Sequence, residues 1–227
     1  MPRETLEREI KALQNEVLLL GSMVEEATLS AVEALKRKDL QASQRVVAGD
    51  RAINAKRFAI ENACLSVIAT QQPVAQDLRI ITAILEIITE LERIGDYAKG
   101  IAEITLRLGD QPLVKPLIDI PRMAQKAVDM LHRALSAFVA GDDHAAGRLP
   151  MEDDEVDGLY NQVYRELLTI MMADPQKIDG ATYLLWVAHN LERMADRVTN
   201  ICERTVFLAK GEMSELDTSK GDTSGAP

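Results

Sequence analysis

Two acidic motifs, one hundred residues apart, contain the residues of this sequence that are best suited to chemistry. Residues 91–96 read LERIGD and residues 191–196 read LERMAD, so the pairs are Glu92 with Asp96 and Glu192 with Asp196. Residues four apart project from one side of a helix. Like charges at this spacing oppose helix formation by roughly 0.2–0.5 kcal/mol per pair, so a compensating cation is expected.

A second acidic pattern precedes each motif. It reads Asp153-x-x-x-Asp157 in the second half of the chain, and the matching positions in the first half are Asp50 and Asn54. If neighbouring helices are antiparallel, three or four carboxylates converge on one patch in each half. Oxygen ligands favour hard ions such as Mg²⁺, Ca²⁺, Mn²⁺ or iron over zinc held by thiolates. The alternative is that these carboxylates are solvated surface groups, paired with Arg93 and Arg193.

Long helices must position these motifs. Apolar spacing and the placement of Gly and Pro predict helices over residues 3–37, 39–70, 73–108, 117–140, 151–172 and 178–209. Asp39 is expected to start the second helix and Gly141 to end the fourth. Pro73 is expected in the first turn of the third helix, where its missing N–H costs nothing, with Asp77 near the positive end.

The two halves of the chain repeat. The apolar positions of the third helix recur one hundred residues later in the sixth, with the 3-4 spacing of a helical bundle. They are Ile84, Ile87, Leu91, Ile94, Ala98 and Ile101, followed by Leu184, Val187, Leu191, Met194, Val198 and Ile201. The second and fifth helices match at an offset of 103. The expected fold is all-α, with two tandem three-helix bundle repeats over residues 1–110 and 111–211 and a flexible tail over 212–227.

Composition excludes several classes of function. The formal net charge is −10, which argues against unaided nucleic-acid binding. No stretch is apolar enough for a membrane span, and the charged N-terminus lacks a signal-peptide core, so we expect a cytoplasmic protein that reaches a membrane only through partners. Cys64 and Cys202 lie within apolar helical patterns and are expected to be buried, reduced thiols.

No catalytic constellation is visible. The sequence has no Gly-rich phosphate loop, nucleophile elbow or paired-Cys metal motif. His189 lies three residues before Glu192 and is a candidate neighbour of that carboxylate. A carboxylate-bridged di-metal protein for oxidation or metal storage is one alternative, but it would use Glu-x-x-His pairs that this chain lacks. A purely structural scaffold is another.

The motifs in combination resemble those of the PhoU family. The segment 71–79, QQPVAQDLR, followed by LERIGD resembles its first-repeat signature, and NLERMAD over 190–196 resembles the second. The resemblance covers residues 4 to 210 and implies a pair of three-helix bundles. It also implies a non-enzymatic negative regulator of phosphate uptake and phosphate-starvation signalling, which links the ATPase subunit of the phosphate ABC transporter to its sensor histidine kinase, and a homodimer.

The resemblance also bears on the acidic motifs, because some family members bind metal ions or clusters at such positions. The metal candidates carried over are Glu92, Asp96, Asp153, Asp157, Glu192 and Asp196, together with Asp50. Asn54 departs from the family's usual acidic residue. This departure makes the first-repeat site the poorer candidate of the two.

Overall fold

The computed structural model describes residues 2–211 and residue 216, and within them it contains helices and no strand. The all-α prediction with six long helices is confirmed. The expected tail over 212–227 lies outside the described residues, apart from Leu216, whose backbone N–H donates to Glu203 Oε1 at 2.9 Å. None of the described helices is long and apolar enough to cross a membrane.

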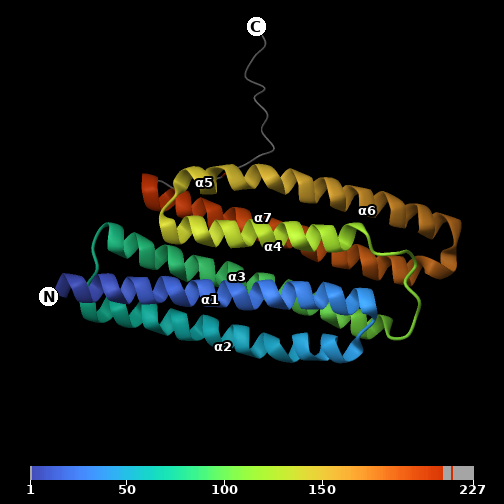
Figure 1. The fold of residues 1–227 in the computed structure, drawn as a ribbon, viewed down its shortest axis with the longest axis horizontal. Coiled ribbons are helices and arrows are strands. Elements are labelled where there is room, and N and C mark those ends of the chain that lie inside the picture. Colours follow the sequence, from blue (N-terminus) through green and yellow to red (C-terminus); the bar gives the residue numbers. More distant parts are fainter. Residues whose placement is uncertain (1, 212–215, 217–227) are drawn as a thin grey trace, which may run out of the picture.

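Three long helices form the first repeat, and three long helices with short additions form the second (Figure 1). The first set is α1 (Pro2–Arg37), α2 (Leu40–Gln71) and α3 (Gln76–Leu108). The second set is α4 (Asp119–Ala140), α5 (Asp143–Arg148), η1 (Leu149–Glu152), α6 (Asp153–Ala173), η2 (Pro175–Lys177) and α7 (Ile178–Lys210). Most predicted ends agree within one or two residues, which is the ordinary uncertainty of helix boundaries.

Side-chain capping and left-handed residues set several of the helix ends. Asp39 caps α2 as predicted, and its carboxylate accepts from the Ala42 N–H at 2.9 Å. Gly141 ends α4 and Gly211 ends α7, with φ values of 66° and 74°. Glycine adopts this left-handed conformation without the steric cost of a Cβ.

The start of α3 differs from the prediction. Pro73 lies outside the helix, in the connection between Gln71 and Gln76, and does not occupy a first turn. A residue before proline is disfavoured in the right-handed α region, so α2 does not continue through Gln72. Gln72 caps the helix in the left-handed conformation with φ 49°, and its N–H donates to the Ile68 carbonyl at 3.3 Å. Asp77 does lie in the first turn of α3, where it is buried and paired with the Arg3 guanidinium.

The entry into α6 also differs from the prediction of one helix starting at Met151. Met151 belongs to the 3₁₀ turn η1, and the short helix α5 precedes it. Asp142 caps α5 by accepting from the Ala145 N–H at 2.9 Å. Pro150 cannot donate a backbone hydrogen bond, so the chain turns tightly here before α6 begins at Asp153.

The two repeats lie side by side, with α3 against α7 and α1 against α4, while α2 and α6 form the outer edges (Figure 1). Glu86 of α3 pairs with Arg204 of α7, and Glu90 pairs with Arg197. Residues further along α3 thus pair with residues earlier in α7, so the two helices are antiparallel. Continuing these antiparallel pairings along the two helices brings Gly95 opposite Ala195. These two residues are also equivalent positions of the two repeats, so an approximate two-fold axis relating the repeats passes near them.

The core is built from the predicted apolar stripes. All twelve repeat-related positions on α3 and α7 are buried, from Ile84 to Ile101 and from Leu184 to Ile201. Burying a side chain of this size contributes about 1.5–3 kcal/mol relative to exposure. Cys64 and Cys202 are buried free thiols, as predicted, and burial raises the pKa of Cys64 to about 11 and that of Cys202 to about 12.

Gly95 provides a test of how tightly α2 packs on α3. A Cβ at Gly95 would lie 3.2 Å from Ile53 Cγ2, whereas a Cβ at Gly158 on α6 would meet nothing within 4 Å. Gly95→Leu should therefore overpack the seam and lower the free energy of unfolding by about 1–3 kcal/mol. Gly158→Leu, the matched control, should raise it by about 0.5–1 kcal/mol through helix propensity. Urea denaturation decides, and equal effects of the two substitutions would contradict this packing.

Candidate functional site

The first acidic cluster lies on the seam between α2 and α3. Asp50 on α2 is buried, and its Oδ2 atom accepts from Asn54 Nδ2 at 3.1 Å and from Lys99 Nζ at 3.0 Å. Lys99 comes from α3, one turn beyond Asp96. The hydrogen bond from Lys99 neutralises Asp50 locally, and it also raises the pKa of Lys99. One carboxylate of the predicted first-repeat set is thus already paired with a cation of the chain.

Glu92 and Asp96 complete the first cluster on the α3 side. Burial and then the charge of Asp96 raise the pKa of Glu92, while the Arg57 guanidinium on α2 opposes that rise. Partial burial and then the charge of Asp50 raise the pKa of Asp96, and here Lys99 opposes. The three predicted carboxylates therefore lie within electrostatic reach of each other, between two cations.

The second acidic cluster lies on the seam between α6 and α7. Asp153 and Asp157 lie at the start of α6, facing Glu192 and Asp196 on α7. Burial raises the pKa of Asp153 to about 7, with Asp157, Asp196 and Glu192 adding repulsion. Burial, followed by the charge of Asp196, also raises the pKa values of Asp157 and Glu192. The four predicted carboxylates thus converge and disfavour each other's ionisation.

Two oxygens of the second cluster lack hydrogen-bond donors. Asp153 Oδ1 and Glu192 Oε2 are buried atoms with no hydrogen-bond partner among the described residues. His189 Nδ1 lies 3.2 Å from Glu192 Oε2, close enough for an ion pair when protonated but not aligned as a hydrogen bond. Arg193 donates to Asp196 Oδ2 at 2.9 Å. Unsatisfied buried carboxylate oxygens on two helices are what a cation or water would satisfy.

The two clusters fit a metal ion differently. Within residues 2–211 and 216, no three His, Cys, Asp or Glu side chains already stand in a metal-binding arrangement. The second cluster has four carboxylates and two unpaired oxygens, which fits a hard cation once the side chains close on it. The first cluster fits poorly, because the Lys99 ammonium contacts its most buried carboxylate, whereas in the second cluster Arg193 contacts Asp196, whose side chain is 34% exposed. Lys99 was not singled out by the sequence, although its place one turn after Asp96 was a usable signal.

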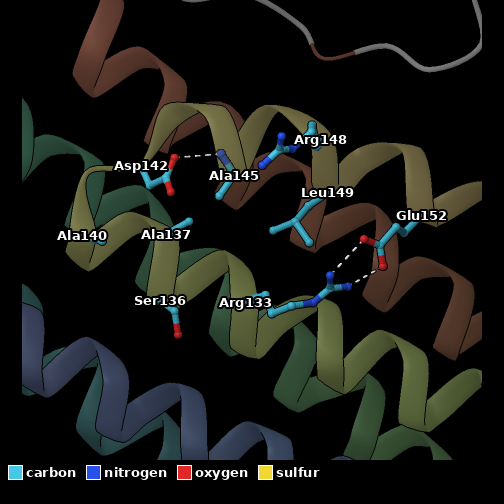
Figure 2. Close-up of a pocket in the computed structure, with 9 residues that line it drawn as sticks. All are labelled: Arg133, Ser136, Ala137, Ala140, Asp142, Ala145, Arg148, Leu149 and Glu152. Carbon is cyan, nitrogen blue, oxygen red and sulfur yellow. Dashed lines mark hydrogen bonds and ion pairs between the residues drawn. The ribbon is translucent and has the colours of Figure 1, made fainter.

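A separate pocket lies between α4 and α5 and contains none of the seven predicted carboxylates (Figure 2). Its volume is about 370 Å³, and small apolar residues such as Ala137 and Leu149 form its walls. Arg133 and Glu152 close one end as a two-pronged ion pair, with Nη1 to Oε1 at 2.9 Å. These two charges satisfy each other at that end of the pocket.

The fold and the two seams define a class: a tandem helical-bundle protein with a carboxylate cluster in each repeat. Comparison with known proteins gives the family. The PhoU domain matches residues 17–105 and 120–205, once in each repeat. The chain belongs to the PhoU family, which confirms the resemblance noted in its motifs.

Relatives and solved structures agree with this membership. The phosphate-specific transport system accessory protein PhoU of Edwardsiella tarda is 37% identical over 204 residues, covering 90% of this chain and 84% of that protein. The crystal structure of the phosphate transport system regulatory protein PhoU from Streptococcus pneumoniae matches with a TM-score of 0.85 and 32% identity, covering 92% of this chain and 99% of that one. PhoU from Pseudomonas aeruginosa matches with the same TM-score and 31% identity, over 91% and 99% of the chains.

The raised pKa of Asp153 predicts how stability depends on pH without metal. The folded protein holds this proton up to about pH 7, whereas the unfolded chain releases it near the usual value of 3.8. Stability is therefore highest below the unfolded pKa and is lost as the pH rises through the folded pKa. Asp153→Asn should reduce the fall in the free energy of unfolding between low and neutral pH. The reduction should be on the order of 1 kcal/mol, because solvent screens partly exposed charges.

Thermal melts in EDTA between about pH 4 and pH 7.5 measure this effect. Glu26→Gln, which removes an exposed carboxylate from α1, is the control and should leave the profile unchanged. A wild-type profile with no decline over this range would contradict the burial and the repulsion assigned to the Asp153 carboxyl group.

Proposed function

We propose that this protein represses phosphate uptake and phosphate-starvation signalling when phosphate is plentiful. It acts as a non-enzymatic adaptor between the ATPase subunit of the phosphate ABC transporter and the phosphate sensor histidine kinase. The observation that carries the proposal is membership of the PhoU family over both repeats. Relatives of similar length are accessory or regulatory proteins of phosphate transport by name.

The adaptor role needs docking surfaces, and α6 offers one. Tyr164, Leu168 and Met172 follow each other at four-residue spacing on one face of α6, and their exposed fractions are 43%, 43% and 79%. Trp186 on α7 is also half-exposed and stacks edge-on against Tyr183. Aromatic and methionine side chains are enriched in the centres of protein interfaces. The net charge of −10 would steer the molecule toward basic surfaces at low salt.

We further propose that the second cluster binds a hard divalent or ferric cation, such as Fe, Mn, Mg or Ca, as part of this regulatory role. Asp153 and Asp157 would hold the ion from α6, with Glu192 and Asp196 from α7. The ion would offset the repulsion among four carboxylates, so its binding would tie α6 to α7. In this proposal the cation is a structural and regulatory ligand, and no reaction step depends on it.

The adaptor proposal predicts a partner and a surface. The tagged protein, purified from phosphate-replete cells, should retain the transporter ATPase subunit. Leu168→Ser/Met172→Ser should reduce the recovered ATPase several-fold, because it removes apolar contact area without touching the core. Leu19→Ser on α1, where Leu19 is also half-exposed, is the matched control. Absence of the ATPase from the wild-type eluate would count against the adaptor.

The metal proposal is tested by elemental analysis of the purified protein after dialysis against a Mn²⁺ buffer. Asp153→Asn/Glu192→Gln/Asp196→Asn should lose the bound Mn²⁺, because three of the four proposed ligands lose their charge. The same substitutions should raise stability in EDTA by relieving repulsion. Equal metal content in the variant and the wild type would rule out this site.

A further inference from the structure

The two acidic clusters occupy equivalent places in the two repeats but differ in their cations. Asp50, Glu92 and Asp96 correspond to Asp153, Glu192 and Asp196 at offsets of 103 on the outer helices and 100 on α3 and α7. At the same offsets, Lys99 corresponds to Thr199 and Arg57 to Tyr160. Asn54 corresponds to Asp157, so the second cluster also has one more carboxylate.

Lys99 contacts a carboxylate of its own repeat, and Arg57 and Tyr160 interact electrostatically with one. Lys99 Nζ is 3.0 Å from Asp50 Oδ2, and their side chains are 34% and 8% exposed. Arg57 acts on Glu92 from the neighbouring helix, just as Tyr160 lies within electrostatic reach of Glu192. The first cluster thus holds two positive side chains at positions where the second holds a phenol and a hydroxyl.

The hydrogen-bond pattern follows the same division. In the second repeat Asp153 Oδ1, Glu192 Oε2 and Thr199 Oγ1 are all buried without a hydrogen bond among the described residues, although His189 Nδ1 lies 3.2 Å from Glu192 Oε2. In the first repeat the counterpart glutamate, Glu92, leaves no such oxygen, and the unsatisfied buried atoms are Asp50 Oδ1 and Arg57 Nε. Asp50 Oδ2 accepts from both Asn54 and Lys99. A metal ion that enters the first cluster would have to displace the Lys99 ammonium from Asp50. The ion and the ammonium would then lie next to each other, and their positive charges would repel.

We propose that Lys99 is a built-in substitute for a metal ion, so that this protein binds a hard cation in its second repeat and excludes one from its first. The inference rests on the metal binding proposed above for the second repeat. The two seams have equivalent positions in the two repeats, but they differ in the cation that neutralises their carboxylates. The α2–α3 seam is closed by a covalently attached cation that is always present. The α6–α7 seam depends on the supply of metal.

Titration with Mn²⁺, followed by calorimetry and elemental analysis, tests this assignment on the full chain. The wild type should bind one Mn²⁺ per chain. Asn54→Asp/Lys99→Thr, which gives the first cluster the residues of the second at the two positions nearest Asp50 and keeps Arg57, should bind two. Lys99→Arg keeps a cation at the position and should still bind one. Two ions in the wild type, with no change in the double variant, would overturn the role of Lys99 while leaving metal binding in the second repeat intact.

The opposite failure is also distinguishable. No ion in the wild type and one in Asn54→Asp/Lys99→Thr would support the role of Lys99 and refute the second-repeat site. No ion in either protein would overturn both. If the double variant does not fold, hydrogen exchange of the wild type with and without EDTA replaces it. Protection should fall on α6 and α7 near the second cluster and stay constant around Asp50, and loss of protection at both seams would overturn the assignment.

Discussion

The burial of the apolar stripes of α3 and α7 is the constraint on which the other features of this molecule depend. Each stripe packs within its own three-helix bundle, and the two helices also pack against each other across the repeat boundary. Once the stripe is buried, the rotation of each helix is fixed, because turning it would expose the core. Glu92 on α3 then faces the seam with α2, and Glu192 on α7 faces the seam with α6. The positions of both carboxylates are thus fixed by the burial of the apolar stripe on their own helix.

This arrangement places charge repulsion where packing cannot relieve it. The carboxylates of the second cluster are held together by two helices whose apolar faces are already committed to the core. Burial of Asp153, and then repulsion from the neighbouring carboxylates, raise its pKa to about 7, so ionisation costs free energy in the folded state alone. Ionisation of Asp153 at rising pH therefore opposes the packing of α6 against α7.

Much of this arrangement was accessible from the sequence. The heptad spacing predicted the core faces of α3 and α7. The repeat offsets, together with the assumption that neighbouring helices are antiparallel, predicted that Asp50 lies near Asp96 and Asp153 near Asp196. These predictions succeeded because helix periodicity fixes which side chains share a face. The connection at Pro73 and the short helix α5 were not predicted, since they depend on single-residue backbone conformations and local capping. The contact of Lys99 with Asp50 was missed as well, because a lysine on a helix surface can extend in several directions.

Family membership places this chain among proteins named for phosphate transport. The central claim is that it restrains phosphate uptake and starvation signalling. The most direct measurement is the expression of a phosphate-responsive reporter in a strain that lacks the gene, grown in plentiful phosphate. The account predicts that the reporter stays on, and that a plasmid copy of this chain switches it off. Normal repression in the deletion strain, with no second PhoU protein to cover the loss, would contradict it.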